Sequence, residues 1–195
     1  AHDLRAPGAA IVSITQDRLA RSPADEAMAA ILRHAHYSLS VASGFVQLSR
    51  AELRPLVLGE VDLCELAQQV VDMAWSPEKG DRFGLEVAAS VPAGGAVVRA
   101  DAELLRRALS NLIDNALRHG PAAGRVTVAV EAGPGSRWRL SVEDEGQPLE
   151  ASVRERVFEP FWRSSAAPPG GSGLGLAFVQ VVAQRHHATA YCTPA

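Results

Sequence analysis

The chain has 195 residues, of which 47% are hydrophobic and 21% are charged, and its formal net charge is −3. A chain of this length can form one large domain or two modest domains with real hydrophobic cores, and the composition is that of an ordinary globular protein. The acidic balance argues against a general nucleic-acid-binding protein, for which a basic excess is expected.

The cysteine content and the hydropathy indicate the cellular compartment in which the chain is expected. Cys64 and Cys192 are the only cysteines and have no metal-binding spacing, which fits a reducing compartment. No apolar run approaches the roughly 18 residues of a transmembrane helix, and no signal peptide is present. Because the chain starts at Ala1 without methionine, we expect a cytoplasmic fragment of a longer protein, with any membrane attachment supplied by segments outside it.

The first 55 residues or so predict a helical hairpin. Leu4, Ile11 and Ile14 indicate one amphipathic helix, and Ser22 followed by Pro23 predicts the start of a second. The apolar positions of the second helix follow steps of four and three residues, as in a bundle seam: Met28, Leu32, Ala35, Leu39, Ala42 and Val46. A lone hairpin cannot bury both faces, so we expect a homodimeric four-helix bundle; packing on the rest of the chain is the alternative.

Arg54 and Pro55 are expected to end the hairpin and to begin a linker that reaches Gly59. The remainder is expected to combine helices over residues 61–75, 101–119 and after Gly173 with strands over residues 83–88, 96–99, 125–131, 138–143 and 189–192. Strands and helices without strict alternation predict an α+β fold, with helices on one face of a mixed sheet.

A histidine next to a carboxylate opens the chain, His2-Asp3. A carboxylate bound to one ring nitrogen fixes the tautomer and leaves the other nitrogen's lone pair free to attack. Pro7 is expected to bend the helix near this ring. The pair is a candidate nucleophile, although a His-Asp pair on an exposed helix is more commonly an ordinary surface pair.

A polar stripe is expected on the helix over residues 101–119. Asn111, Asn115 and Arg118 share one face of it, whereas the apolar residues share another. Amide oxygens suit Mg²⁺, and amide and guanidinium donors suit phosphate. A solvated polar face is the other interpretation, but such a face would use Glu and Lys more often than paired asparagines.

Two further segments contain glycine beside chemistry-bearing groups. Asp144 ends an alternating strand and is followed by Gly146, which could present a carboxylate to an exocyclic amine or could be a plain turn. Gly170-Gly171-Ser172-Gly173-Leu174-Gly175-Leu176 runs into a helix, where glycines and free N–H groups accommodate phosphate. This loop matches neither a Walker A motif nor a Rossmann fingerprint.

In this order, the segments resemble the H, N, G1 and G2 boxes of sensor histidine kinases. Residues 157–163, Val-Phe-Glu-Pro-Phe-Trp-Arg, resemble the F box, and residues 48–52, Leu-Ser-Arg-Ala-Glu, fall where the family's second helix carries a Leu-Ser-Arg motif. The resemblance spans nearly the whole chain. It implies a dimerisation and phosphotransfer hairpin over residues 1–55 and an ATP-binding domain of the GHKL (Bergerat) type over residues 60–195, an α/β sandwich similar to gyrase and heat-shock ATPases.

The resemblance also implies a role for each motif residue. His2 would accept the phosphoryl group of ATP, with Asp3 orienting it, before an aspartate of a response-regulator receiver domain receives it. The implied ATP and Mg²⁺ ligands are Asn115 for the metal, with Asn111, Arg118, His119, Asp144, Gly146, Gly171, Ser172, Gly173, Leu174, Gly175 and Leu176 for the nucleotide. Residues 163–170 would form a lid, and the other histidines are expected at surface or packing positions.

Departures from the family pattern qualify the expected activity. Ala6 stands where many members carry Thr or Asn, a residue that helps position water, so we expect weak phosphatase activity. Gln147 and Pro148 follow Gly146 where the family normally has a second glycine, and Pro148 stiffens that wall of the pocket. A degenerate nucleotide-binding scaffold that acts through protein contacts is therefore the main alternative, and an ATPase that couples hydrolysis to conformational change is a more remote one.

Overall fold

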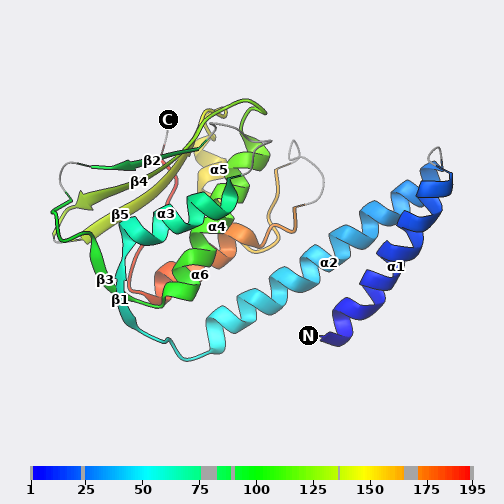
Figure 1. The fold of residues 1–195 in the computed structure, drawn as a ribbon, viewed down its shortest axis with the longest axis horizontal. Helices are drawn as coiled ribbons and strands as arrows, with labels where there is room; N and C mark the ends of the chain where they lie inside the picture. Colours follow the sequence, from blue (N-terminus) through cyan, green and yellow to red (C-terminus); the bar gives the residue numbers. More distant parts are fainter. Residues whose placement is uncertain are drawn as a thin grey trace.

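The computed structural model describes residues 2–22, 25–75, 83–88, 91–135, 137–164 and 171–193, with only the backbone for residues 2–5 and 87. Two long helices, α1 (His2–Arg21) and α2 (Glu26–Leu53), form an antiparallel hairpin. The hairpin projects from a mixed α/β part that contains the remaining elements (Figure 1). The predicted hairpin and α+β class are therefore confirmed.

The second helix begins later than predicted. Asp25 is its N-cap, and its Oδ1 accepts a hydrogen bond from the Met28 N–H at 3.0 Å. The predicted start at Ser22 is wrong, because the following Asp25 supplies the side-chain acceptor; Pro23 lies outside the described residues. The helix ends where predicted, since Arg54 adopts an extended backbone ahead of Pro55.

The α/β part begins with β1 (Gly59–Asp62), which was expected to be linker and the start of a helix. It continues with α3 (Leu63–Ala74), β2 (Phe83–Val87), β3 (Val97–Ala100), α4 (Ala102–His119), β4 (Val126–Gly133), β5 (Arg137–Asp144), α5 (Ala151–Arg156) and α6 (Gly175–Arg185). Helix α5 was not predicted. The structure assigns no strand at residues 189–192, so that prediction is wrong.

The strands form two sheets. Strands β1 and β3 pair antiparallel, while β4 lies between a parallel β2 and an antiparallel β5. In the first part of β4 every second residue is fully buried, namely Val126, Val128 and Val130. Val128 and Val130 pack with residues of α3 and α4 in the main core. One face of the sheet is therefore covered by helices, as predicted.

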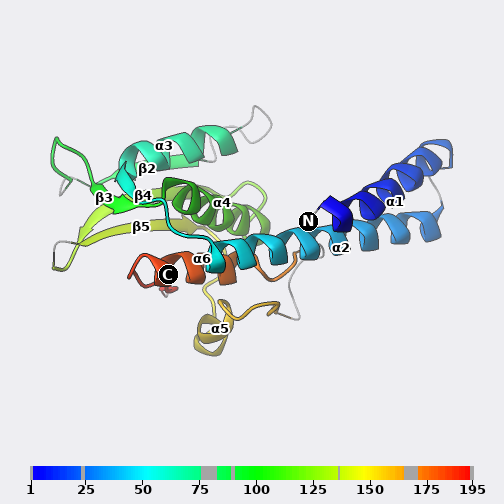
Figure 2. The same cartoon turned by 90° about the horizontal axis from the view of Figure 1, so that it is seen from below.

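A second apolar cluster joins the hairpin to the α/β part. Leu48 and Ala51 of α2 pack with Leu104 of α4 and with Leu174 and Phe178 at α6. Figure 1 shows α2 between α1 on one side and the α/β part on the other, and Figure 2 shows α1 beside the portion of α2 that projects from the α/β part. Among the described residues, no helix is long and apolar enough to cross a lipid bilayer.

Candidate functional site

Helix α4 positions the predicted polar stripe. Asp101 caps its N-terminus by accepting the Leu104 N–H at 3.1 Å. The helix buries one side into the core through Leu104, Ala108, Leu109, Ile113 and Ala116. This burial fixes the rotation of the helix and leaves Asn111 and Asn115 half-buried and Arg118 exposed. The stripe therefore lies where the helix leaves the core.

The glycine-rich loop before α6 lies against this stripe. Asn111 Nδ2 donates a hydrogen bond to the Gly175 carbonyl at 3.3 Å. A Cβ added to Gly171 would be 3.1 Å from Arg118 Nη1, so the guanidinium lies close to the loop backbone. The structure thus brings together the polar stripe of α4 and the glycine loop, which are far apart in the sequence. The hydrogen bond joins residues that are 64 positions apart.

The backbone of this loop requires glycine at Gly173. Its φ is +69°, and a Cβ there would lie 2.7 Å from the Phe161 carbonyl carbon. Phe161 N–H donates to the Gly173 carbonyl at 2.9 Å, and Phe161 itself has φ +64°. Ser172 Oγ accepts a long hydrogen bond from Leu174 N–H at 3.4 Å. The predicted F box and G2 box are therefore one connected structure.

Asp144 and Gly146 form the other side of the candidate site. The Gly146 N–H donates to Asp144 Oδ1 at 2.7 Å, and a side chain on Gly146 would collide with that oxygen. Asp144 Oδ2 has no hydrogen-bond partner among the described residues and is available to a ligand. A Cβ on Gly120 would lie 3.4 Å from Asp144 Oδ1. Gly120 follows α4, so this carboxylate lies beside the end of the helix that carries the stripe.

His119 is also at this end of α4. Desolvation lowers the pKa of its imidazole, and the charges of Arg118 and Arg163 lower it further, whereas Asp144 opposes them. Arg118, Asp144 and Arg163 therefore all act on this ring electrostatically. The imidazole is neutral at pH 7, and it can accept as well as donate a hydrogen bond.

Asn115 is the predicted Mg²⁺ ligand. Its amide has no hydrogen-bond partner among the described residues and lies one turn from Asn111 on the same face. An unengaged amide oxygen beside a guanidinium and a glycine loop is the type of donor that Mg²⁺ can use together with substrate phosphates. The residues present therefore fit the metal. No group of three or more His, Cys, Asp or Glu side chains in the described part of the chain forms an all-protein metal site.

His2 and Asp3 lie at the start of α1, and their side chains are outside the described parts. The pairing of α1 with α2 places their backbone: a Cβ on Gly8 would overlap Leu39. Because the helices are antiparallel, the first turn of α1 lies beside the stretch of α2 near Phe45. Residues 165–170 of the predicted lid lie outside the described residues.

One contact near the site was not predicted from the sequence. A Cβ on Gly44 of α2 would lie 3.0 Å from Leu174 Cδ1 and 3.4 Å from Ser172 Oγ. Helix α2 therefore approaches the loop backbone closely. The signal in the sequence is a glycine inside a strong helix, where it costs roughly 1 kcal/mol relative to alanine unless close packing requires it.

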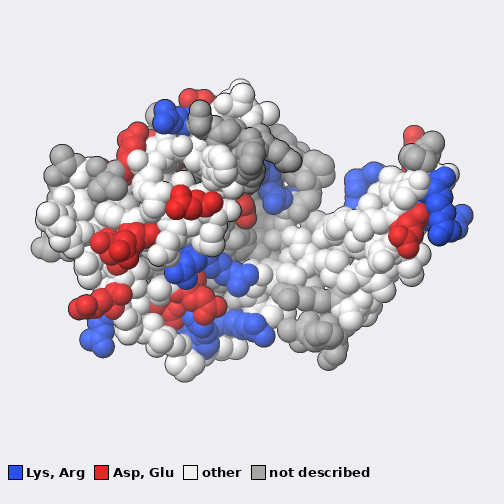
Figure 3. Space-filling model, viewed as in Figure 1, with Lys and Arg blue, Asp and Glu red and all other residues white. Residues whose placement is uncertain are grey.

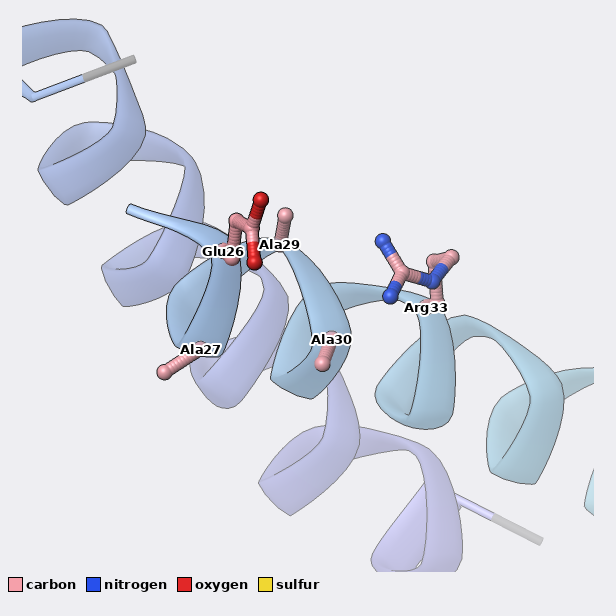
Figure 4. Close-up of a pocket in the computed structure, with 5 residues that line it drawn as sticks. All are labelled: Glu26, Ala27, Ala29, Ala30 and Arg33. Carbon is pink, nitrogen blue, oxygen red and sulfur yellow. The ribbon is translucent and has the colours of Figure 1, made fainter. Parts of the chain in front are cut away.

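A shallow hollow on the described surface lies elsewhere. It has a volume of about 570 Å³ and is lined by Glu26, Ala27, Ala29, Ala30 and Arg33 in the first turns of α2. Figure 4 shows the Glu26 and Arg33 side chains apart from each other on α2, with alanine methyl groups as the other lining side chains. This hollow has no chemistry that would bind a nucleotide.

Comparisons with known proteins agree with this geometry. The family described as "Histidine kinase-, DNA gyrase B-, and HSP90-like ATPase" matches residues 100–195. The histidine-protein kinase/phosphatase MprB of Mycobacterium sp. (strain KMS) is 38% identical over 142 residues, which cover 72% of this chain and 26% of that protein. The solved structure of a mycobacterial sensor histidine kinase MprB is 32% identical, with a TM-score of 0.55, and covers 67% of this chain and 81% of its own.

Two larger solved structures match more of the chain. Full-length ShkA in complex with AMPPNP is 27% identical with a TM-score of 0.68, covering 94% of this chain and 39% of that one. Histidine kinase ThkA in complex with response regulator protein TrrA is 22% identical with a TM-score of 0.63, covering 96% and 53%, and shows similarity of fold alone. The chain spans between 21% and 26% of the length of the first curated relatives that it matches.

Proposed function

The chain belongs to the sensor histidine kinases with a GHKL-type ATP-binding domain, and on this premise we propose that it transfers the γ-phosphoryl group of ATP to His2. We further propose that residues 1–55 form the dimerisation and phosphotransfer hairpin and that residues 60–195 form the catalytic domain. Its place in the cell is then cytoplasmic, with any membrane anchor in other parts of the parent protein.

One observation carries this proposal: the polar stripe of α4 touches the glycine loop, through Asn111 to Gly175 and through Arg118 beside Gly171. Phosphoryl transfer depends mainly on positioning and on neutralising charge, because little covalent chemistry is required of the protein. A guanidinium, two amides and the backbone of a glycine loop supply these functions in one place.

Each remaining residue has a defined task in this proposal. Asp144 Oδ2 accepts a hydrogen bond from the adenine amine, while Gly146 allows the ring to approach the backbone. Neutral His119 contacts the nucleotide at the end of α4. Asn115 would hold Mg²⁺, which supplies positive charge to the phosphates, with Asn111 supporting it.

The phosphoryl group then passes from His2 to an aspartate of a response-regulator receiver domain. Support for this partner comes from family membership and from the fold shared with ThkA, which was solved with a response regulator. Ala6 lacks a side-chain group that could position water, so we expect weak dephosphorylation of the regulator. Replacement Ala6→Thr should increase that activity, measured as loss of label from a phosphorylated receiver domain; no increase would contradict this explanation.

Incubation of the chain with γ-labelled ATP and Mg²⁺ tests the main proposal. We expect label on the protein that is stable in base, labile in acid, and absent from His2→Gln. The variant Asn115→Ala should lose labelling while keeping its fold by circular dichroism. If the wild-type chain binds ATP without becoming labelled, the scaffold alternative replaces the kinase; if it does not bind ATP, both are rejected.

A further inference from the structure

Helix α4 carries a further basic residue on the face of the polar stripe. Arg107 lies about one turn before Asn111 and about three turns before Arg118. The three side chains therefore lie within about 40° of one another around the helix axis. Arg107 is exposed, and it was not among the residues predicted to bind the nucleotide. It extends the stripe toward the start of the helix.

The Arg107 side chain is positioned by α6. Its Cζ lies over the ring of Phe178, 5.7 Å from the ring centroid. Phe178 is 2% exposed and belongs to the apolar cluster that contains Leu48 of α2 and Leu174 of the loop. The Phe178 N–H donates to the Leu174 carbonyl at 2.9 Å, so the ring projects from the first turn of α6. Because a guanidinium is attracted to the face of an aromatic ring, Arg107 is held where α4, α6 and α2 meet.

The contacts of α4 on this face follow one another in order along the helix. From its C-terminal end toward its N-terminal end, the contacting pairs are Gly120 and Asp144, Arg118 and Gly171, Asn111 and Gly175, and Arg107 and Phe178. At a rise of about 1.5 Å per residue, the first and last of these positions on α4 are about 20 Å apart. An extended ligand that lies along the stripe meets the contacts in the same order.

The proposed function, on which this inference rests, gives the nucleotide a direction along the stripe. Asp144 is the proposed contact of the adenine amine and lies beside the C-terminal end of α4. The phosphates then extend past Arg118 and the glycine loop toward Asn111. The terminal phosphate of ATP is therefore the part nearest to Arg107, whereas ADP ends one phosphate earlier.

The terminal phosphate requires positive charge beside it during transfer. Its negative charge is spread over its oxygens in the transition state, so catalysis depends on groups that neutralise this charge. Asn111 is an uncharged amide, and Arg118 lies beside Gly171 toward the other end of the stripe. Figure 3 shows Lys and Arg side chains, with acidic side chains among them, where Figure 1 places the first half of α4 and the end of α2. Positive charge is thus present at the end of the stripe where the transferred group is expected.

We propose that Arg107 is a further catalytic residue, whose guanidinium contacts the terminal phosphate of ATP and stabilises the charge on the transferred phosphoryl group. Phe178 holds this guanidinium about one turn of α6 from Gly175. Rotation about the side-chain bonds of Arg107 brings it to the phosphate. The planar fork of a guanidinium can bind two phosphate oxygens at once, which orients the transferred group as well as neutralising it.

The transfer step is that of the proposed function. The lone pair of an imidazole nitrogen of His2 forms a bond to the γ-phosphorus, and the bond from the γ-phosphorus to the bridging oxygen breaks. ADP leaves with that electron pair, and the proton on the other ring nitrogen passes to the Asp3 carboxylate. Arg107 neither gives nor takes a proton in this step and contributes charge and orientation alone.

Calorimetry with ADP and with a non-hydrolysable ATP analogue tests the contact without any transfer. Arg107→Gln should lower the affinity for the ATP analogue about tenfold or more, because a hydrogen bond to a charged group is lost. Its affinity for ADP, which lacks the terminal phosphate, should change less than about twofold. Arg107→Lys should retain part of the preference for the ATP analogue, because its ammonium keeps the charge. Equal losses for both nucleotides would assign Arg107 to packing on Phe178, and this outcome or no loss for either would overturn the inference.

The rate of labelling from γ-labelled ATP tests the catalytic role. At saturating ATP, Arg107→Gln should label about tenfold or more slowly, with its helix content unchanged by circular dichroism; labelling at the wild-type rate would contradict this role. Arg106→Gln is the matched control, because Arg106 donates to Gln69 of α3 at 3.3 Å, and it should change neither affinity nor rate. A wild-type chain that binds both nucleotides without becoming labelled would reject the proposed function, while its affinity ratio still tests Arg107. A wild-type chain that binds neither would reject both.

Discussion

Arg54 connects the end of α2 to a buried carboxylate of the ATP-binding part. Its Nη2 lies 2.9 Å from Asp101 Oδ1 and 2.8 Å from Oδ2, and Asp101 also accepts the Val57 N–H at 3.0 Å. The Asp101 side chain is 2% exposed and that of Arg54 is 31% exposed. Helix α6 reinforces the joint, because Arg185 Nη1 donates to the carbonyls of Ala51 and Arg54.

The replacement Arg54→Met removes the cation while keeping much of the apolar stem. A hydrogen bond to a charged group contributes about 1.5–3 kcal/mol, and the partial exposure of Arg54 favours the lower half of that range. We therefore expect the free energy of unfolding to fall by about 2 kcal/mol. The replacement Asp101→Asn keeps an N-cap acceptor for α4 but removes both the ion pair and the oxygen that accepts the Val57 N–H, so the coupling to Arg54 is what isolates the ion pair.

A double-mutant cycle in urea, followed by circular dichroism, measures the interaction. We expect a coupling free energy of about 1–2 kcal/mol between positions 54 and 101. Glu103→Gln is the matched control, since it removes the other partner of the same guanidinium at a side chain that is 72% exposed; it should cost less than about 0.5 kcal/mol. Additive effects of Arg54→Met and Asp101→Asn would refute the reasoning.

The same joint predicts a pH dependence. Burial by itself raises the pKa of Asp101, but the Val57 and Leu104 N–H groups, Arg54 and His186 outweigh it and hold the pKa below its usual value. A carboxyl group with a lowered folded pKa contributes stability above its unfolded pKa of about 4, and the contribution is lost as the pH falls through the folded pKa. The stability difference between wild type and Asp101→Asn should therefore shrink on acidification below about pH 4.

Three further predictions concern the nucleotide site. Gly173→Ala should weaken binding of an ATP analogue at least tenfold in calorimetry, because its Cβ would meet the Phe161 backbone, whereas Gly135→Ala, with φ +67° and open space around it, should only lower stability. Asp144→Asn should weaken adenine-nucleotide binding about tenfold by exchanging an acceptor for a donor; unchanged affinity for ATP relative to GTP would contradict its role. Because the folded pKa of His119 is lowered, the native state loses stability as the pH falls through about 6.5 and below, so His119→Gln should flatten the stability profile between pH 7 and 5; an unchanged profile would exclude this explanation.

The parts of the fold that sequence predicted correctly are those with long periodic patterns. Helix α4 spans five turns with a clear apolar face and a capping Asp101, so its bounds and its polar stripe followed directly. Strand β1 and helix α5 have only 4 and 6 residues, too short for periodicity to indicate either. Their formation depends on tertiary partners, as the pairing of β1 with β3 illustrates.

The contacts of individual side chains could not be predicted from the sequence where they join residues far apart in the chain. His186 was expected at an ordinary surface or packing position, but its Nε2 accepts the Asp101 N–H at 3.0 Å while its Nδ1 lies 2.8 Å from the Val182 carbonyl. Likewise, Gly44 inside a helix indicates close packing, but its neighbours in the sequence do not identify the loop that it touches. The contacts of both residues are long-range: His186 is 85 positions from Asp101, and Gly44 packs on Leu174.

The joint around Asp101 also constrains protein engineering. A chimera that exchanges the hairpin of this chain for that of another kinase would separate Arg54 from Asp101 if the crossover were placed in the connection after α2. The carboxylate would then depend on whatever residue the donor hairpin carries at the equivalent position. A chimera should therefore take residues 54, 101 and 185 from the same parent protein. The identities of these three residues predict whether a given hairpin and a given α/β part will pack together.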